Sequence, residues 1–170
     1  MHDIGKIGFP DELLGLPVNL IVGDHLGIFR RHPARAEQLL MPLEDLRGVA
    51  AVLRAHMERH DGAGFPDGII GASIPLGARI VALASDYDNL QLGALVQRRV
   101  LEPDARQIIY DSEGKRYDPA VVAAFRALME GDPQVRQRDH AIIARTSRRA
   151  WCWRATWSRR TARCCSRPSM

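Results

Sequence analysis

Histidines and an aspartate able to bind metal ions lie at three places in the first 60 residues. His2 and Asp3 are adjacent near the start of the chain, His32 precedes a proline, and His56 closes an apolar pattern. Imidazole nitrogen and carboxylate oxygen suit iron or manganese ions. Adjacent helical residues point about 100° apart, so Asp3 can bridge two cations while His2 binds one. Taken alone, these residues fit structural roles better than metal binding: a polar helix end at His2-Asp3 and a satisfied core histidine at position 32.

The segment 56–68, HMERHDGAGFPDG, is a charged, glycine-rich turn that follows a predicted helix. Looking back along that helix, Leu46, Val49, Leu53 and His56 recur at steps of three and four, which places His56 on the face toward the core. The turn combines glycines that tolerate positive φ, a proline that fixes φ and aspartates that bond their own backbone. We therefore expect a tight, ordered loop beside a buried imidazole.

These motifs together resemble the HD-GYP domain. His2-Asp3-Ile4-Gly5-Lys6 matches the HD half, and Gly64-Phe65-Pro66 stands in the GYP place, with phenylalanine for tyrosine. The match continues through His32-Pro33 and the closing YDPAVVAAF to about Phe125. The resemblance implies an all-α, HD-type helical bundle that acts as a metal-dependent phosphodiesterase on cyclic di-GMP in bacterial second-messenger signalling.

The resemblance also implies a role for each matching residue. His2, Asp3, His32 and His56 would hold two divalent transition metals, most often iron or manganese. Asp3 and Lys6 would be catalytic, although Lys6, three residues after Asp3, also suits a simple ion pair with that carboxylate. The loop would contact substrate or partners, including GGDEF-type signalling proteins; its matching residues are Arg59, Asp61, Gly62, Gly64, Phe65 and Pro66.

Two departures from the family affect the expected ligand set before residue 60. Matching domains carry a further ligand on a helix upstream of the His-Asp pair, so we expect a bundle that is incomplete at the N-terminus. Met57 stands where the family usually has a second histidine, and a thioether is a poor ligand for iron or manganese. His60, four residues after His56, is a conceivable replacement if the helix continues that far.

A third departure falls in residues 76–92, which the sequence predicts as a central buried helix. The family's closing aspartate corresponds to Ser85, whereas here the aspartate is Asp86. One residue on a helix is a rotation of about 100°, so Asp86 serves as a ligand only if a π-bulge shifts the register. The alternative for Asp86 is a surface or capping carboxylate. The apolar stripe of this helix is predicted from Ile80, Leu83, Ala84 and Tyr87.

The net charge of +4 hides two unlike parts of the chain. Residues 1–139 carry 16 Lys+Arg and 20 Asp+Glu, whereas residues 140–170 carry eight Arg and no acid. We interpret residues 1–130 as a partial HD-GYP-like domain and 131–170 as a basic tail outside the fold, with a frameshift near residues 136–142. A nucleic-acid-binding tail is the rival interpretation, but periodicity and a recognised module are missing, so we expect no specific nucleic-acid binding.

The remaining expectations concern location and activity. The sequence contains neither an apolar run of about 18 residues nor a signal peptide pattern, which favours a cytoplasmic protein without a membrane segment. The leading hypothesis is a cyclic di-GMP phosphodiesterase whose activity is weakened by the missing ligands. The alternatives are a non-catalytic interaction module that uses the GYP-like loop, and a truncated gene product without function.

Overall fold

The computed structural model describes residues 2–131, and every regular element among them is helical. An isolated bridge between Glu113 and Tyr117 is the sole β-type pairing in that part of the chain. The elements, in chain order, are η1 (His2–Lys6), α1 (Asp11–Leu14), η2 (Val18–Leu20), α2 (Gly23–Leu40), η3 (Glu44–Leu46), α3 (Arg47–Ala55), η4 (Gly71–Ser73), α4 (Leu76–Leu92), α5 (Glu102–Asp111) and α6 (Pro119–Glu130). The predicted all-α class is therefore confirmed.

The chain divides into a compact unit, Met1–Phe125, and a second unit that begins at Arg126. The first unit contains every candidate site residue. The predicted basic tail lies outside the described residues from position 132 onward, so its separation from the fold stays a prediction. None of the helices described in residues 2–131 is long and apolar enough to cross a membrane.

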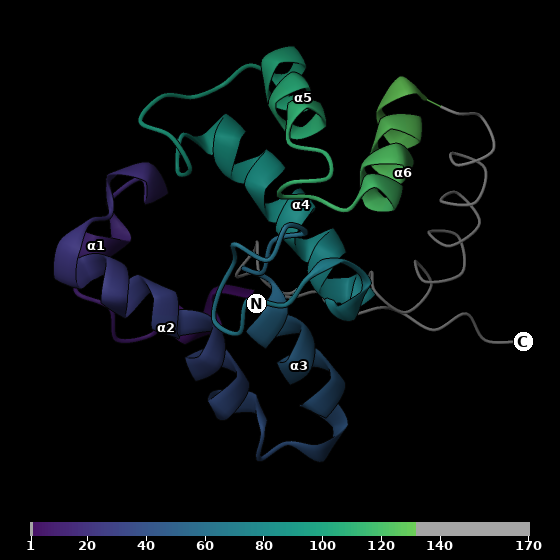
Figure 1. Cartoon of the computed structure of the whole chain (residues 1–170). Helices are drawn as coiled ribbons and strands as arrows, with labels where there is room; N and C mark the ends of the chain where they lie inside the picture. Colours follow the sequence, from purple (N-terminus) through teal and green to yellow (C-terminus); the bar gives the residue numbers. More distant parts are fainter. Residues whose placement is uncertain (1, 132–170) are drawn as a thin grey trace, which may run out of the picture. The chain divides into compact units, whose positions relative to one another are not determined.

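Helices α2 and α3 lie side by side (Figure 1), and η1 packs on α2. Small residues allow the close approach: Ala36 and Ala50 are almost fully buried and pack with Leu40 and Leu53. Gly5 is required where η1 meets α2, because a Cβ there would lie 1.9 Å from the carbonyl oxygen of His32. Val49, predicted to face the core, is instead 37% exposed, since Ala50 and Leu53 form the buried face of α3.

Helix α4 begins after Pro75 and ends at Leu92, and Gly93, with a φ of 79°, provides the left-handed cap, so the predicted bounds are confirmed. Its predicted buried stripe is wrong in part, because Ile80 is 48% exposed and Ala84 is also exposed. The buried face of α4 is rotated from the predicted one and contains Ala78, Ala82, Leu83, Asp86 and Leu90. A carboxylate on this face needs partners, which the segment before α6 supplies.

The start of α6 packs against α4 and α5 through aromatic rings. Phe125 makes edge contacts with Tyr87 at 5.0 Å and Tyr110 at 6.2 Å between ring centroids. Asp118 precedes α6 and accepts a hydrogen bond from the Ala120 N–H at 2.7 Å, as expected for a helix N-cap. The end of the HD-GYP match is thus part of the core of the first unit.

Candidate metal and active site

The side chains of His32 and His56 meet between α2 and α3. Both residues are fully buried, and their Nε2 atoms lie 3.4 Å apart. Nδ1 of His32 lies 2.6 Å from the carbonyl oxygen of Phe29, and Nδ1 of His56 lies 2.6 Å from that of Leu53. Carbonyl oxygen only accepts hydrogen bonds, so we assign the proton to Nδ1 in both rings. Each Nε2 therefore carries a bare lone pair, and the two lone pairs face one another.

Burial keeps both imidazoles neutral at pH 7. Removal from water lowers the pKa of His32 to about 4 and lowers the pKa of His56 as well, because a buried charge is poorly solvated. Two neutral rings that both donate through Nδ1 share no proton between their Nε2 atoms. This facing pair of acceptors is the arrangement that a positive ion satisfies, and backbone carbonyls on Nδ1 are the usual partners that orient metal-bound histidines.

Residues of η1 place a carboxylate and an ammonium beside the two histidines. Nε2 of His2 lies 3.3 Å from a carboxylate oxygen of Asp3, and the His2 and His56 ring centroids are 5.9 Å apart. Nζ of Lys6 lies 2.8 Å from the other Asp3 oxygen, as the predicted ion pair requires. Burial opposes charge on Asp3, but the hydrogen bond from Lys6 and the nearby positive charges outweigh it, so the pKa of Asp3 lies below its usual value.

The donor chemistry of this cluster fits a transition-metal ion, although its geometry is open. Bare imidazole nitrogens beside an ionised carboxylate are ligands for iron, manganese or zinc. Within residues 2–131, however, three His, Cys, Asp or Glu side chains do not converge on one point as they would in a closed site. The structure therefore brings His32 and His56 into ligand geometry and leaves His2 and Asp3 as neighbours on η1.

The predicted tight loop is held by a residue that the sequence analysis did not single out. The carboxylate of Glu58, 3% exposed, accepts hydrogen bonds from three successive backbone N–H groups. The distances are 2.7 Å to Asp67, 3.1 Å to Gly68 and 3.2 Å to Ile69. The sequence did contain a signal for this role. Glu58 is a single acidic residue between a predicted buried helix and a turn, and the backbone N–H groups of such a turn need acceptors because they lack helical or sheet partners.

The outer part of the loop is held by arginine–aspartate pairs. Arg59 bonds Asp61 through two nitrogens at 3.0 Å and 2.6 Å, which lowers the pKa of Asp61. Asp61 also accepts a hydrogen bond from the Ala63 N–H at 3.0 Å, which is the expected local turn. Arg54 bonds both oxygens of Asp67 at 2.7 Å. The loop is ordered by paired charges as well as by its glycines.

Glycine and aromatic residues of the GYP-like motif fit closely against the rest of the site. Gly64 is required, because a Cβ there would lie 2.4 Å from the backbone nitrogen of Arg59. Gly62 has a φ of 80°, and the peptide bond between Phe65 and Pro66 is cis. The Phe65 ring packs edge-on against Phe29 at 6.2 Å, in the apolar cluster that Met57 also contacts. Met57 is therefore a packing residue in this structure.

The surface or capping interpretation of Asp86 is wrong, because its side chain is buried, forms an ion pair with Arg116 and accepts a hydrogen bond from the Tyr117 hydroxyl at 2.8 Å. Its ligand interpretation stays a prediction, and α4 is α-helical throughout without the π-bulge which that interpretation requires. The helical relation that would bring His60 to the side of His56 is absent, because α3 ends at Ala55. Nδ1 of His60 is buried without a hydrogen-bond partner among the described residues.

The all-helical fold presents a His-Asp pair beside two buried histidines, the arrangement that the HD-GYP resemblance implied. Residues 1–121 match the family described as HD domain. The chain belongs to this HD domain family. That finding, together with the relatives below, confirms the HD-GYP resemblance.

Relatives of the chain carry names that describe cyclic dinucleotide hydrolysis. The cyclic di-GMP phosphodiesterase response regulator RpfG of Xanthomonas campestris is 37% identical over 140 residues, which cover 81% of this chain and 36% of RpfG. A cyclic di-GMP phosphodiesterase of Vibrio cholerae is 36% identical over 142 residues, with 76% of this chain and 28% of the relative covered. The chain thus spans about a third of the length of these relatives.

A solved structure supports the fold. The crystal structure of a cyclic GMP-AMP specific phosphodiesterase of V. cholerae, V-cGAP3, aligns with a TM-score of 0.55 and 25% sequence identity. The alignment covers 66% of this chain and 26% of that protein.

Proposed function

We propose that this domain is a cytoplasmic, metal-dependent phosphodiesterase of cyclic dinucleotides, with cyclic di-GMP as the first candidate substrate. The observation that carries the proposal is the pair of bare Nε2 atoms of His32 and His56, 3.4 Å apart and fixed by backbone carbonyls. Relatives named for cyclic di-GMP and for 3'3'-cGAMP support a cyclic dinucleotide as the substrate class.

His32 and His56 would hold the metal through Nε2, and Asp3 and His2 would supply further donors. When bound, divalent metal ions of this kind lower the pKa of water and stabilise charge on a phosphoryl group. We propose two ions of iron or manganese as the full complement, which His2, Asp3, His32 and His56 would hold. Lys6 has three N–H donors and uses one on Asp3, so the others can bind a non-bridging phosphate oxygen and offset its developing charge.

Metal content provides the direct test. The purified 170-residue chain, loaded with iron or manganese and desalted, should retain metal, whereas His32→Ala and His56→Ala should each lose most of it. His25→Ala is the matched control, because His25 lies on the same helix α2 and outside the site. Equal retention by all three variants and the unchanged chain would contradict the assignment. Because the described donors form an open site, we expect slow turnover of cyclic di-GMP by this chain.

The second candidate function is a non-catalytic interaction module, favoured by the way the loop is held. Glu58 accepts hydrogen bonds from the loop backbone, and Arg54 forms an ion pair with Asp67 of the loop. GGDEF-type signalling proteins are the proposed partners. The test compares the unchanged chain with Asp3→Ala. If both bind a purified GGDEF domain with equal affinity and neither hydrolyses cyclic di-GMP, the result favours the interaction module over the enzyme.

A further inference from the structure

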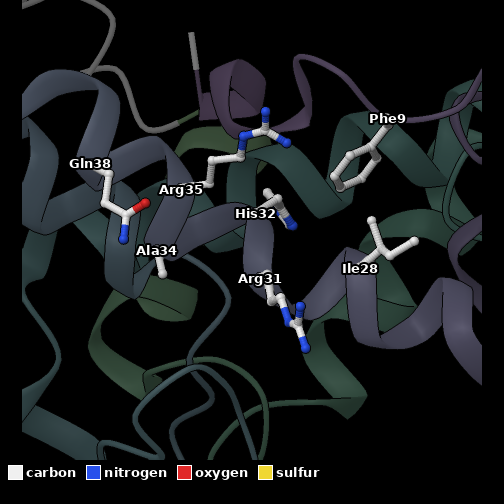
Figure 2. Close-up of a pocket in the computed structure, with 7 residues that line it drawn as sticks. All are labelled: Phe9, Ile28, Arg31, His32, Ala34, Arg35 and Gln38. Atoms are coloured by element: carbon white, nitrogen blue, oxygen red, sulfur yellow. The ribbon is translucent and has the colours of Figure 1, made fainter.

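A pocket of about 410 Å³ lies on the face of α2 next to Phe9 (Figure 2). Its volume is in the range of small-molecule sites. Figure 2 shows apolar Phe9 and Ile28 at one end of the pocket and Gln38 at the other, with the side chains of Arg31 and Arg35 between these ends on either side of His32. The pocket therefore has an apolar end, a cationic middle and an amide at the far end.

The two guanidinium groups of this pocket have no acidic partner among the residues that the structure describes. Neither Arg31 nor Arg35 forms an ion pair with any residue in the described range 2–131, whereas Arg47, Arg54, Arg59, Arg79, Arg106 and Arg116 all do. Arg31 and Arg35 are one helical turn apart on α2 and both line the pocket. Two positive charges beside one cavity favour a ligand with two negative charges.

The local backbone accommodates Arg35 at the edge of the pocket. Gly8 has a φ of 84°, and a Cβ there would lie 3.2 Å from Nη2 of Arg35. The Arg35 guanidinium thus lies beside Gly8, which has no side chain. At the apolar end, Phe9 is 8% exposed and packs with Leu13 and Phe29, so the ring is held in place.

We propose that this pocket binds a nucleoside monophosphate through its terminal phosphate. A phosphate monoester carries close to two negative charges at neutral pH and three terminal oxygens, which match two guanidinium forks, whereas a diester carries one charge. Phe9 and Ile28 provide apolar surface for the nucleobase or sugar, and Gln38 provides both a donor and an acceptor for its polar edge. GMP is the probe that combines these features.

This pocket shares a single residue, His32, with the candidate metal cluster. His2, Asp3, Lys6 and His56 do not line it. Binding of a nucleoside monophosphate in this pocket therefore requires neither bound metal nor hydrolysis. It can be tested independently of the proposed phosphodiesterase function.

The test is calorimetric titration of the full 170-residue chain in the presence of a chelator. GMP should bind at least tenfold more tightly than cyclic GMP or guanosine, because only GMP offers a terminal phosphate. Arg31→Ala and Arg35→Ala should each weaken GMP binding by tenfold or more, and Arg31→Lys should retain part of the affinity because it keeps the charge but loses the fork. Inorganic phosphate should bind more weakly than GMP, since it leaves the apolar end empty.

Two control variants locate the binding. Arg47→Ala removes an exposed arginine on α3 and should leave GMP affinity unchanged. Lys6→Ala removes the cation of the candidate active site and should also leave it unchanged. The proposal is overturned if GMP binds no better than guanosine, if both arginine variants bind GMP normally while retaining the helical circular dichroism of the parent, or if Lys6→Ala abolishes binding.

Discussion

Replacing Glu58 tests whether one buried carboxylate holds the GYP-like loop. The residue sits two positions after His56, and its oxygens accept the N–H groups of Asp67, Gly68 and Ile69. Glu58→Ala removes the acceptor of all three while leaving the glycines and the proline of the loop unchanged. The substitution therefore isolates the anchor from the turn residues.

The expected loss of stability follows from the number of donors left without a partner. A buried N–H that loses its acceptor costs about 1–3 kcal/mol. Partial relaxation of the loop lets water reach some of these groups, and Arg54 still holds Asp67, so we expect Glu58→Ala to lose about 3 kcal/mol. Glu58→Gln keeps an acceptor for two N–H groups but turns its NH₂ toward a third donor, and it should lose roughly half as much.

Urea unfolding of the full chain, followed by circular dichroism, measures the free energy of unfolding. Amide hydrogen exchange at residues 67–69 should accelerate in Glu58→Ala more than exchange in the middle of α4. Glu44→Ala is the matched control, because Glu44 is 84% exposed and contacts Arg47 at 3.3 Å; it should change stability by less than about 0.5 kcal/mol. A Glu58→Ala variant as stable as this control would refute the anchoring role.

Three further predictions concern the histidine cluster. The pKa of His32 is about 4 in the folded chain and 6.5 unfolded, and that of His56 is also lowered, so the unfolded state binds more protons as pH falls. The free energy of unfolding of the metal-free chain, measured in urea, should therefore drop between pH 6.5 and 4, by as much as about 3 kcal/mol for His32. The drop should be smaller in His32→Asn. Asp3→Ala should lose its bound metal and any phosphodiesterase activity. Lys6→Ala should lose part of the activity and keep its metal. Elemental analysis of both purified variants measures the metal content. Met57→His should modestly raise iron or manganese retention, although it removes an apolar contact, and unchanged retention would argue against a ligand role for position 57.

The sequence predicted the elements better than the faces they bury. Helix α4 was placed correctly because proline and glycine flank it, and both act locally. Its buried face was misplaced because Asp86 is neutralised by Arg116, which lies 30 residues further along the chain. A carboxylate on an apolar helix looks like a surface residue until its distant cation is known, since burial of a charge depends on tertiary pairing.

The site showed the same limit. Periodicity placed His32 and His56 on inward faces, and both are fully buried. Which ring nitrogen carries the proton depends on carbonyls at Phe29 and Leu53, three residues earlier on each chain segment, and on the approach of α2 to α3. The role of Glu58 was not predicted, because its hydrogen-bond donors are backbone N–H groups 9 to 11 residues further along the chain. Backbone donors leave no pattern of side chains in the sequence.

The loop and the histidine cluster share structural supports, so their positions are coupled. On one side, Glu58 follows His56 by two residues and fixes the far end of the loop. On the other, the Phe65 ring packs on Phe29, whose carbonyl accepts the Nδ1 proton of His32. A displaced loop would therefore disturb the segments that orient both Nε2 atoms. Substitutions that loosen the loop should weaken metal retention, even though none of its residues lies in ligand position.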